Sequence, residues 1–137
     1  MISGLEKKLD EIVSVYARAK ADWKCIKCRR RYMPVKGRNG IPRQNILTAS
    51  HYFNRWKKST RWDIDNIDPA CIFCHTEIEN SKKKPVDGFV YKEYMINKLG
   101  IMGFEELEFK SNKVKIYTEE ELKKMYNDFY SKVKALK

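Results

Sequence analysis

Apolar residues recur at helical spacing near both ends of the chain, whereas the middle holds shorter apolar runs separated by turn formers. An amphipathic helix over residues 3–22 is predicted from one face of the helical wheel, which carries Leu5, Leu9, Ile12, Val13 and Tyr16. Near the other end, Thr118 and Glu121 have the spacing of a capping box. The apolar stripe that follows predicts a last helix packed on the core, through Leu122, Met125, Phe129, Val133 and Leu136.

The middle of the chain predicts strands and short helices. Residues 45–66 favour two short strands around a basic turn, the second being the alternating run 60–67, which Pro69 is expected to end. Residues 71–83 are typical of a metal knuckle that leads into a short helix. A helix over 88–99 should stop at Gly100, and a shorter one is expected over 104–109. The pattern predicts an α+β fold in one domain, 1–137.

Charge narrows the choice of partners. About a third of the residues are charged, so the apolar core is modest, and the formal charge of +11 with a pI near 9.5 favours an anionic partner. Nucleic acid ranks above a membrane surface, and a basic chain can also simply be well solvated. No apolar run approaches the ~18 residues of a membrane span, so we expect no membrane and a cytoplasmic location, the host cytoplasm if a phage encodes the chain.

Two Cys-x-x-Cys pairs, Cys25/Cys28 and Cys71/Cys74, mark the middle of the chain. Four thiolates supply the tetrahedral ligand set of a structural zinc ion, with no position left open for chemistry. Two disulfides, a redox dithiol or unrelated buried cysteines are the alternatives. The pattern therefore predicts one zinc ion that closes a long loop.

Both histidines, His51 and His75, lie with Asn66 inside the segment that the cysteines bracket. Hydrolysis of a phosphodiester requires a base that takes a proton from water and a cation that neutralises charge on the phosphoryl oxygens. An imidazole, with a pKa near 6.5, suits either task as base or metal ligand. We expect one histidine in each role.

The order of these residues resembles a known group of nucleases. Cys-x-x-Cys is followed by His51, then by Asp-Asn-Ile-Asp-Pro-Ala-Cys-Ile-Phe-Cys-His over 65–75, then by a lysine run, as in the HNH (His-Me finger) nucleases. Ala-Ser-His-Tyr at 49–52, Thr-Arg-Trp-Asp at 60–63 and Tyr-Thr-Glu-Glu-Glu at 117–121 resemble more narrowly the phage NinG/Rap recombination endonucleases. This resemblance covers nearly the whole chain from Trp23 onward.

The resemblance implies a zinc-stapled ββα-metal (HNH) core over 23–84, flanked by an N-terminal helix, 1–22, and a C-terminal helical part, 85–137. It implies a metal-dependent endonuclease that cuts branched DNA such as Holliday junctions and D-loops, and a homodimer on a junction would supply two active sites. His51 is then the general base, Asn66 orients the His51 loop, and His75 binds a catalytic Mg²⁺ or Mn²⁺. The products carry 5′-phosphate and 3′-hydroxyl ends.

One position departs from the wider HNH pattern: Ser50 stands where many HNH enzymes have a metal-binding Asp or His. As a second metal ligand we expect Asp63, with Glu79 as the other candidate because it lies one helical turn after His75. Arg61 is predicted to contact a phosphate, although a surface role is the alternative.

Further contacts to DNA are expected from basic and aromatic side chains around the site. The basic set comprises Arg29, Arg30, Arg31, Arg38, Arg55, Lys57, Lys58, Lys82 and Lys83. Trp56 and Tyr52 are candidates for stacking on unpaired bases, whereas Trp62 is expected in the core. The alternatives to a junction endonuclease are a zinc-stabilised DNA-binding module without catalysis and an HNH nuclease that cuts or nicks duplex DNA without junction preference.

Overall fold

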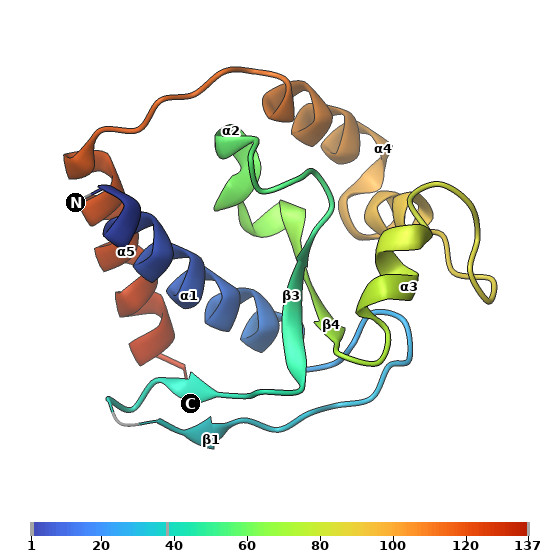
Figure 1. The fold of residues 1–137 in the computed structure, drawn as a ribbon, viewed down its shortest axis with the longest axis horizontal. Helices are drawn as coiled ribbons and strands as arrows, with labels where there is room; N and C mark the ends of the chain where they lie inside the picture. Colours follow the sequence, from blue (N-terminus) through green and yellow to red (C-terminus); the bar gives the residue numbers. More distant parts are fainter. Residues whose placement is uncertain (1, 38, 137) are drawn as a thin grey trace.

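A two-stranded antiparallel hairpin lies at the centre of the computed structural model, which describes residues 2–37 and 39–136, and helices cover both of its faces (Figure 1). The elements are α1 (Ile2–Lys20), β1 (Val35–Lys36), β2 (Pro42–Arg43), β3 (Leu47–His51), α2 (Lys58–Arg61), η1 (Ile64–Asn66), β4 (Ile67–Cys71), α3 (His75–Asn80), α4 (Tyr91–Ser111) and α5 (Glu119–Lys134). Helices thus combine with two small two-stranded sheets. The α+β prediction is confirmed at this level.

The central hairpin pairs β3 with β4 in a register that places Leu47 opposite Cys71 and His51 opposite Ile67. Every residue of β4 is buried. The predicted second strand, 60–67, is therefore wrong, because β4 begins where that run ends and continues through Pro69. Proline fits here because the Pro69 carbonyl accepts a hydrogen bond from the Ile26 amide, so the nitrogen of Pro69 also points away from β3 and no ladder bond is lost.

Local hydrogen bonds explain why the alternating run does not form a strand. The Asp63 side chain accepts from the Asp65 amide at 3.0 Å and caps the 3₁₀ turn η1. Just before it, the chain forms the single-turn helix α2. Short polar side chains of this kind give the backbone partners that compete with a sheet ladder.

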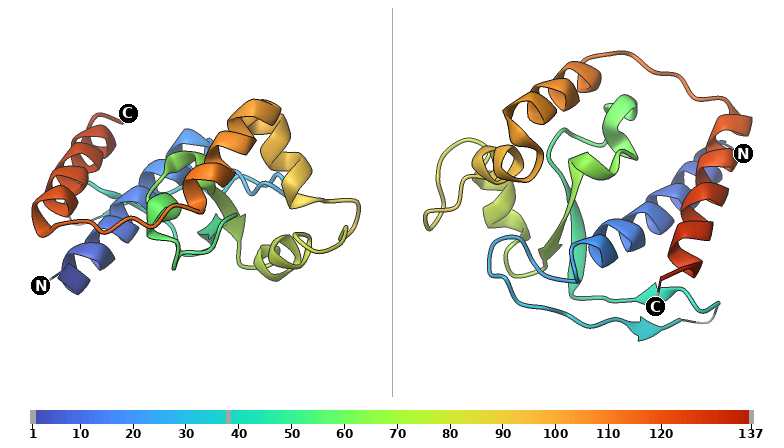
Figure 2. Two further views of the ribbon diagram at one scale, coloured as in Figure 1. Left: turned by 90° about the horizontal axis from the view of Figure 1, so that it is seen from above. Right: turned by 180° about the vertical axis from the view of Figure 1, so that it is seen from behind.

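The two terminal helices pack together on one side of the hairpin, with α5 lying along α1 (Figures 1 and 2). The buried face of α1 includes Leu9 and Val13, and α1 also contacts β3 and β4. Thr118 and Glu121 make both hydrogen bonds of the predicted capping box, and Leu122 and Val133 are buried. The prediction of an amphipathic helix at each end is confirmed.

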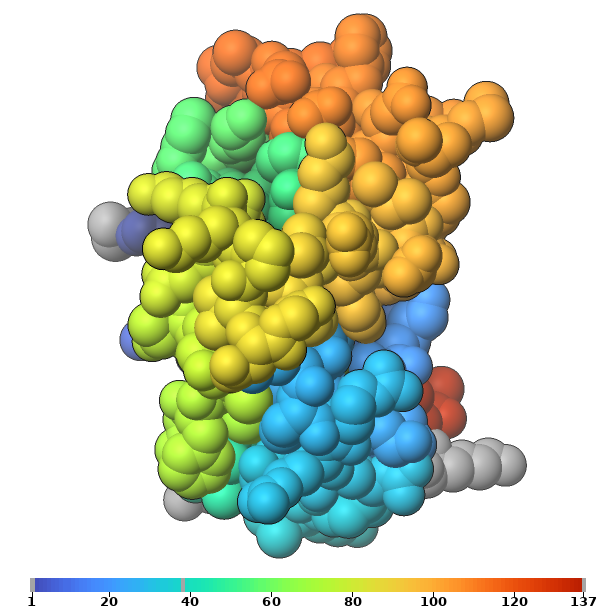
Figure 3. Space-filling model, turned by 90° about the vertical axis from the view of Figure 1, so that its right-hand side faces the viewer, coloured from blue at the N-terminus to red at the C-terminus, as the bar shows by residue number. Residues whose placement is uncertain are grey.

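Helix α4 covers the other side of the hairpin together with α3, and Figure 3 shows this face of the molecule. Gly100, with φ +78°, interrupts the helical geometry inside α4, so the chain forms two helical segments where two were expected. Tyr91, Met95 and Phe104 are the buried anchors of α4. None of the described helices is long and apolar enough to cross a membrane.

Candidate functional site

The four cysteines converge from two distant parts of the chain. Cys25 and Cys28 follow α1, while Cys71 ends β4 and Cys74 directly precedes α3. All four Sγ atoms lie within 4.8 Å of one another, and those of Cys28 and Cys71 are 3.9 Å apart. A tetrahedral zinc ion with Zn–S bonds of about 2.3 Å requires sulfur atoms about 3.8 Å apart. The cluster therefore has the ligand type and spacing of a structural zinc site, which confirms this part of the sequence prediction.

The thiols of the cluster differ in acidity: hydrogen bonds from Cys74 and the backbone outweigh burial and lower the pKa of Cys71. Burial raises the pKa of the Cys25 thiol and that of the Cys74 thiol, because crowded thiolates in an apolar setting are costly to form. Zinc replaces the protons and neutralises that charge. The Ile26 amide bonds to Pro69 at 3.1 Å, so the first knuckle is fixed to β4 by the backbone as well as by its thiols.

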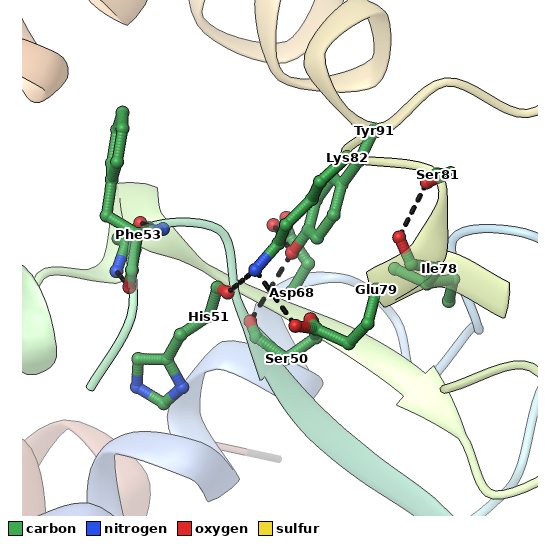
Figure 4. A network of polar contacts seen from close by, with 10 residues as sticks. Ser50, His51, Phe53, Asp68, Ile78, Glu79, Ser81, Lys82 and Tyr91 are labelled. Atoms are coloured by element: carbon green, nitrogen blue, oxygen red, sulfur yellow. Dashed lines mark hydrogen bonds and ion pairs between the residues drawn. The ribbon is translucent and has the colours of Figure 1, made fainter. Parts of the chain in front are cut away.

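His51 is the last residue of β3, and its side chain faces α1 (Figure 4). Its Nε2 atom lies 2.9 Å from the carbonyl oxygen of Arg61. Because a carbonyl only accepts hydrogen bonds, Nε2 carries the proton and Nδ1 presents a lone pair. No hydrogen bond to Nδ1 occurs among the described residues. Burial lowers the pKa of His51, and the nearby Arg55 guanidinium acts in the same direction, so the ring is neutral at neutral pH.

The His51 ring opens into a cleft of about 820 Å³ between α1, α5 and the segment that precedes β3. Lys8, Arg18, Arg43 and Arg55 line this cleft together with two acidic residues, Asp10 and Glu11. Arg18 donates to backbone carbonyls and Arg55 pairs with Asp10, so Lys8 and Arg43 are the two of these four basic side chains with no such partner among the described residues. The cleft can therefore admit an anionic ligand to the free nitrogen of His51.

Asn66 is buried and holds the loop that follows His51. Its Oδ1 atom accepts from the Phe53 amide at 2.8 Å, and its Nδ2 atom donates to the carbonyls of Phe53 and Thr60 at 3.0 and 3.1 Å. These three bonds join the two ends of the loop between β3 and α2 and so fix the backbone that follows His51. This is the geometry that the predicted orienting role requires; a part in catalysis stays a prediction.

A second polar cluster lies on the opposite face of the hairpin, under α3 (Figure 4). Ser50 donates to Glu79 at 2.9 Å, and the Lys82 ammonium reaches both the other Glu79 oxygen and the His51 carbonyl at 2.9 Å. His75 meets β3 two residues earlier, where its Nδ1 atom lies 3.5 Å from the Thr48 hydroxyl. Alternation along β3 thus sends the His51 ring to one face and the Ser50 side chain to the other.

Beneath this cluster, Asp68 is a buried carboxylate on β4. The Tyr91 hydroxyl donates to it at 2.9 Å, and Lys98 pairs with it at 2.6 Å. Burial raises the pKa of Asp68, and the Lys98 charge opposes that rise. Sequence reasoning could not single out Asp68, because both of its partners come from α4, far along the chain.

The predicted ligands of the catalytic metal divide into two groups. Glu79 and His75 both belong to α3 and lie one helical turn apart, and their part in metal binding stays a prediction. Asp63, the preferred second ligand, stays a prediction: one of its oxygens caps η1 and the other pairs with Lys110 at 2.6 Å. Among the described residues, the only group of three or more acidic, histidine or cysteine ligands is the cysteine cluster.

Arg61 does not present its guanidinium to a phosphate. Its Nε and Nη2 atoms donate to Asp10 at 3.0 and 2.7 Å, and Asp10 also accepts from Trp62 at 2.8 Å and from Arg55 at 2.7 Å. The predicted phosphate contact of Arg61 is therefore replaced by an ion pair that ties α1 to the loop after β3. Sequence reasoning missed Asp10, since its partners lie far along the chain.

The remaining predicted DNA contacts are spread over several surfaces. Arg29, Arg30 and Lys83 are exposed, whereas Arg31 pairs with Asp22, Lys58 with Glu6 and Lys57 with Asn112. Arg38 lies outside the described residues.

A scan against protein-family models gave no match, and neither the search of curated proteins nor that of solved structures found a similar protein.

Proposed function

We propose that the chain is a metal-dependent DNA endonuclease with a zinc-stapled ββα-metal (HNH) core, and that it hydrolyses phosphodiesters in branched recombination intermediates. The observation that carries the proposal is His51. A neutral imidazole, held through Nε2 by a backbone carbonyl, keeps Nδ1 without a hydrogen bond among the described residues, and His51 lines a cleft with more basic than acidic side chains at the end of β3. A general base needs this combination of tautomer, low pKa and access.

In this mechanism, Nδ1 of His51 takes a proton from the attacking water, while Asn66 keeps the loop after His51 in place. The basic side chains of the cleft hold the phosphate backbone. Glu79 and His75 would hold Mg²⁺ or Mn²⁺, and the bound ion supplies charge neutralisation at the phosphoryl and leaving oxygens. The His51 ring and the Glu79 carboxylate lie on opposite faces of the end of β3, so the mechanism requires the substrate to pass around that strand end.

A zinc-stabilised DNA-binding module without catalysis is the second candidate. Lys82 favours it, because its ammonium already neutralises Glu79, the only carboxylate of the predicted set on this face. In that case His51 only fixes the loop through Arg61, and the basic cleft serves binding alone.

The test is cleavage of three substrates of matched sequence: a four-way junction, a D-loop and linear duplex, each with Mg²⁺ or Mn²⁺. Wild type should cut the branched substrates faster, and His51→Ala should be at least about 100-fold slower. Tyr126→Phe, which lines the same cleft from α5, is the matched control and should cut normally. Binding without cleavage under every metal tried would establish the binding module, and equal rates on all three substrates would remove the branch preference.

A further inference from the structure

Trp56 is an exposed tryptophan in a chain that buries its other two. It is 72 % exposed, against 8 % for Trp23 and 3 % for Trp62. It lies on the loop between β3 and α2, five positions after His51. A large aromatic surface that is exposed to water beside lysines favours a ligand that offers both apolar contact and negative charge.

The groove beside Trp56 has a volume of about 390 Å³ and two walls. One is the loop with Trp56, Lys57 and Lys58, and the other is the link between α4 and α5, which contributes Lys113, Val114 and Lys115. Lys57 joins the walls, because its ammonium donates to Asn112 at 3.1 Å. We call these two walls and the space between them the Trp56 groove.

The charge of the Trp56 groove is positive. Four lysines line it, and no acidic residue does. Lys58 pairs with Glu6 and Lys115 with Glu121, both outside the lining, whereas Lys113 has no ion pair among the described residues. Val114 is 92 % exposed and adds apolar surface.

Stacking surface interleaved with ammonium groups matches single-stranded nucleic acid. Unpaired bases expose a π-face to an aromatic side chain, and the phosphates that flank them pair with lysines. A duplex keeps its bases stacked inside and offers only the phosphates. Tyr52, the other predicted stacking residue, is excluded because it packs edge-on against Phe53, Tyr91 and Phe104.

The Trp56 groove adjoins the His51 cleft through neighbouring residues. Arg55 lines the cleft that contains His51, and Trp56, the next residue, lines the groove. We propose that the groove binds a single-stranded DNA segment by stacking a base on Trp56, and that the strand continues past Arg55 toward His51. The choice of DNA over RNA and the path toward His51 rest on the proposed function, whereas the binding of a single strand does not.

The test uses the fluorescence of the protein, since Trp56 is the one tryptophan of the three that a ligand can reach. An oligothymidylate, the RNA oligouridylate of equal length and a blunt duplex are titrated without Mg²⁺ or Mn²⁺, so that cleavage plays no part. Oligothymidylate should quench wild-type emission. Trp56→Phe should abolish the quenching yet keep the affinity within about threefold, because a phenyl ring still stacks.

Trp56→Ala should weaken single-strand binding roughly 5- to 150-fold, measured by anisotropy of a labelled oligonucleotide, and leave duplex binding almost unchanged. Phe73→Ala, at an exposed aromatic on the second cysteine knuckle, is the control and should bind normally. Lys113→Gln should lower the slope of log affinity against log salt by about 0.7, as for one phosphate contact.

The proposal that the Trp56 groove binds a single strand would be contradicted by unquenched emission. It would also be contradicted if Trp56→Ala lost equal affinity for single strand and duplex. Equal affinity for the RNA oligonucleotide would overturn the assignment to DNA. These outcomes are independent of cleavage. A protein whose emission is quenched as expected but that cuts no substrate would support single-strand binding in the groove and contradict the proposed endonuclease function.

Discussion

Lys82 donates to Glu79 at 2.9 Å and occupies the place beside this carboxylate that a divalent cation would need. The same ammonium group also reaches the His51 carbonyl, so it bridges α3 to the end of β3. An ammonium group and a metal ion cannot share one carboxylate face without repulsion, since like charges a few ångströms apart destabilise each other. Metal binding at Glu79 therefore competes with Lys82.

Removing the ammonium should strengthen metal binding. Lys82→Met keeps the length and the apolar stem, and we expect it to bind Mn²⁺ at least about tenfold more tightly than wild type, because a charge-assisted bond no longer has to be broken. Electron paramagnetic resonance of free Mn²⁺, recorded on zinc-loaded protein, measures the affinity directly. Lys83→Met, exposed and one residue along, is the control, and equal affinities in the two variants would show that Glu79 is not a metal ligand.

Loss of one zinc ligand should unfold the protein, because two distant segments are joined at the cysteine cluster. Cys71→Ser removes a buried thiolate at the end of β4, and we expect no zinc in the purified protein and no cooperative thermal transition. Ile72→Ser is the matched control, since Ile72 lies in the same knuckle but is 54 % exposed. A zinc-free Cys71→Ser protein that melts like wild type would contradict the structural role of the metal.

The neutral His51 ring should make both activity and stability fall on acidification. Burial lowers the pKa of His51 in the folded protein, so below the usual imidazole value of about 6.5 the unfolded chain binds more protons, and the free energy of unfolding falls as the pH falls. The stability difference between wild type and His51→Asn isolates this effect from that of the carboxylates. We expect this difference in the free energy of unfolding to change with pH below about pH 6.5 and to be constant above that pH.

The same ring predicts an acid limb in the pH profile of kcat/KM, with a midpoint below about 6.5. Zinc content must be measured across the range, because acid also protonates the cysteine thiolates. A midpoint above 7 with zinc retained would mean that a group other than His51 is the base.

The sequence predicts local features of this fold well and long-range ones poorly. Cys-x-x-Cys spacing and the capping box at Thr118 depend on residues a few positions apart, and both match the structure. The strand expected over 60–67 fails, because alternation is a weak signal in a short run and Asp63 supplies a local hydrogen bond that favours a 3₁₀ turn. The prediction that Pro69 ends a strand fails for a related reason, since only the hairpin register reveals that its nitrogen faces away from β3.

In the candidate site, too, local features could be predicted from the sequence and long-range contacts could not. His51 and Glu79 could be proposed from the motif and from helical spacing, but their placement on opposite faces follows from the position of each residue in β3 and α3. Asp68 and Asp10 were not predicted, because each acts through partners distant in the sequence, and Lys82 was expected to contact DNA, although in the structure it bonds to Glu79 and the His51 carbonyl.

Asn66 should be worth more to stability than most exposed or half-buried polar residues. Asn66→Ala leaves the Phe53 amide and two carbonyls without partners in a buried setting, and we expect a loss of about 2–4 kcal/mol in the free energy of unfolding. Urea denaturation measures it, with Asn45→Ala, at an exposed asparagine before β3, as the control. A loss below about 0.5 kcal/mol would show that the loop after His51 does not depend on this side chain.

Asp10 should hold the loop after β3 against α1, and its removal should act on stability and on His51 together. Burial alone would raise the pKa of Asp10, but hydrogen bonds and charge from Arg61, with help from Trp62 and Arg55, outweigh it and lower the pKa. A carboxylate with a lowered pKa stabilises the fold above its unfolded value of about 3.9, and this contribution is lost as the pH falls through the folded value.

Asp10→Asn should therefore cost roughly 1.5–3 kcal/mol at pH 7, because Arg61 is left half-buried without its counter-charge. The difference from wild type should shrink as the pH falls from about 3.9, the unfolded value, through the lower pKa of Asp10 in the folded protein. Asp128→Asn, at an exposed position on α5, is the control and should stay within about 0.5 kcal/mol of wild type. The Arg61 carbonyl accepts a hydrogen bond from His51, so loss of the Asp10–Arg61 ion pair should also make the His51 ring more mobile. Exchange broadening of the His51 resonances in NMR spectra would report this motion. Unbroadened resonances in a destabilised Asp10→Asn protein would show that the ion pair supports the fold without positioning His51.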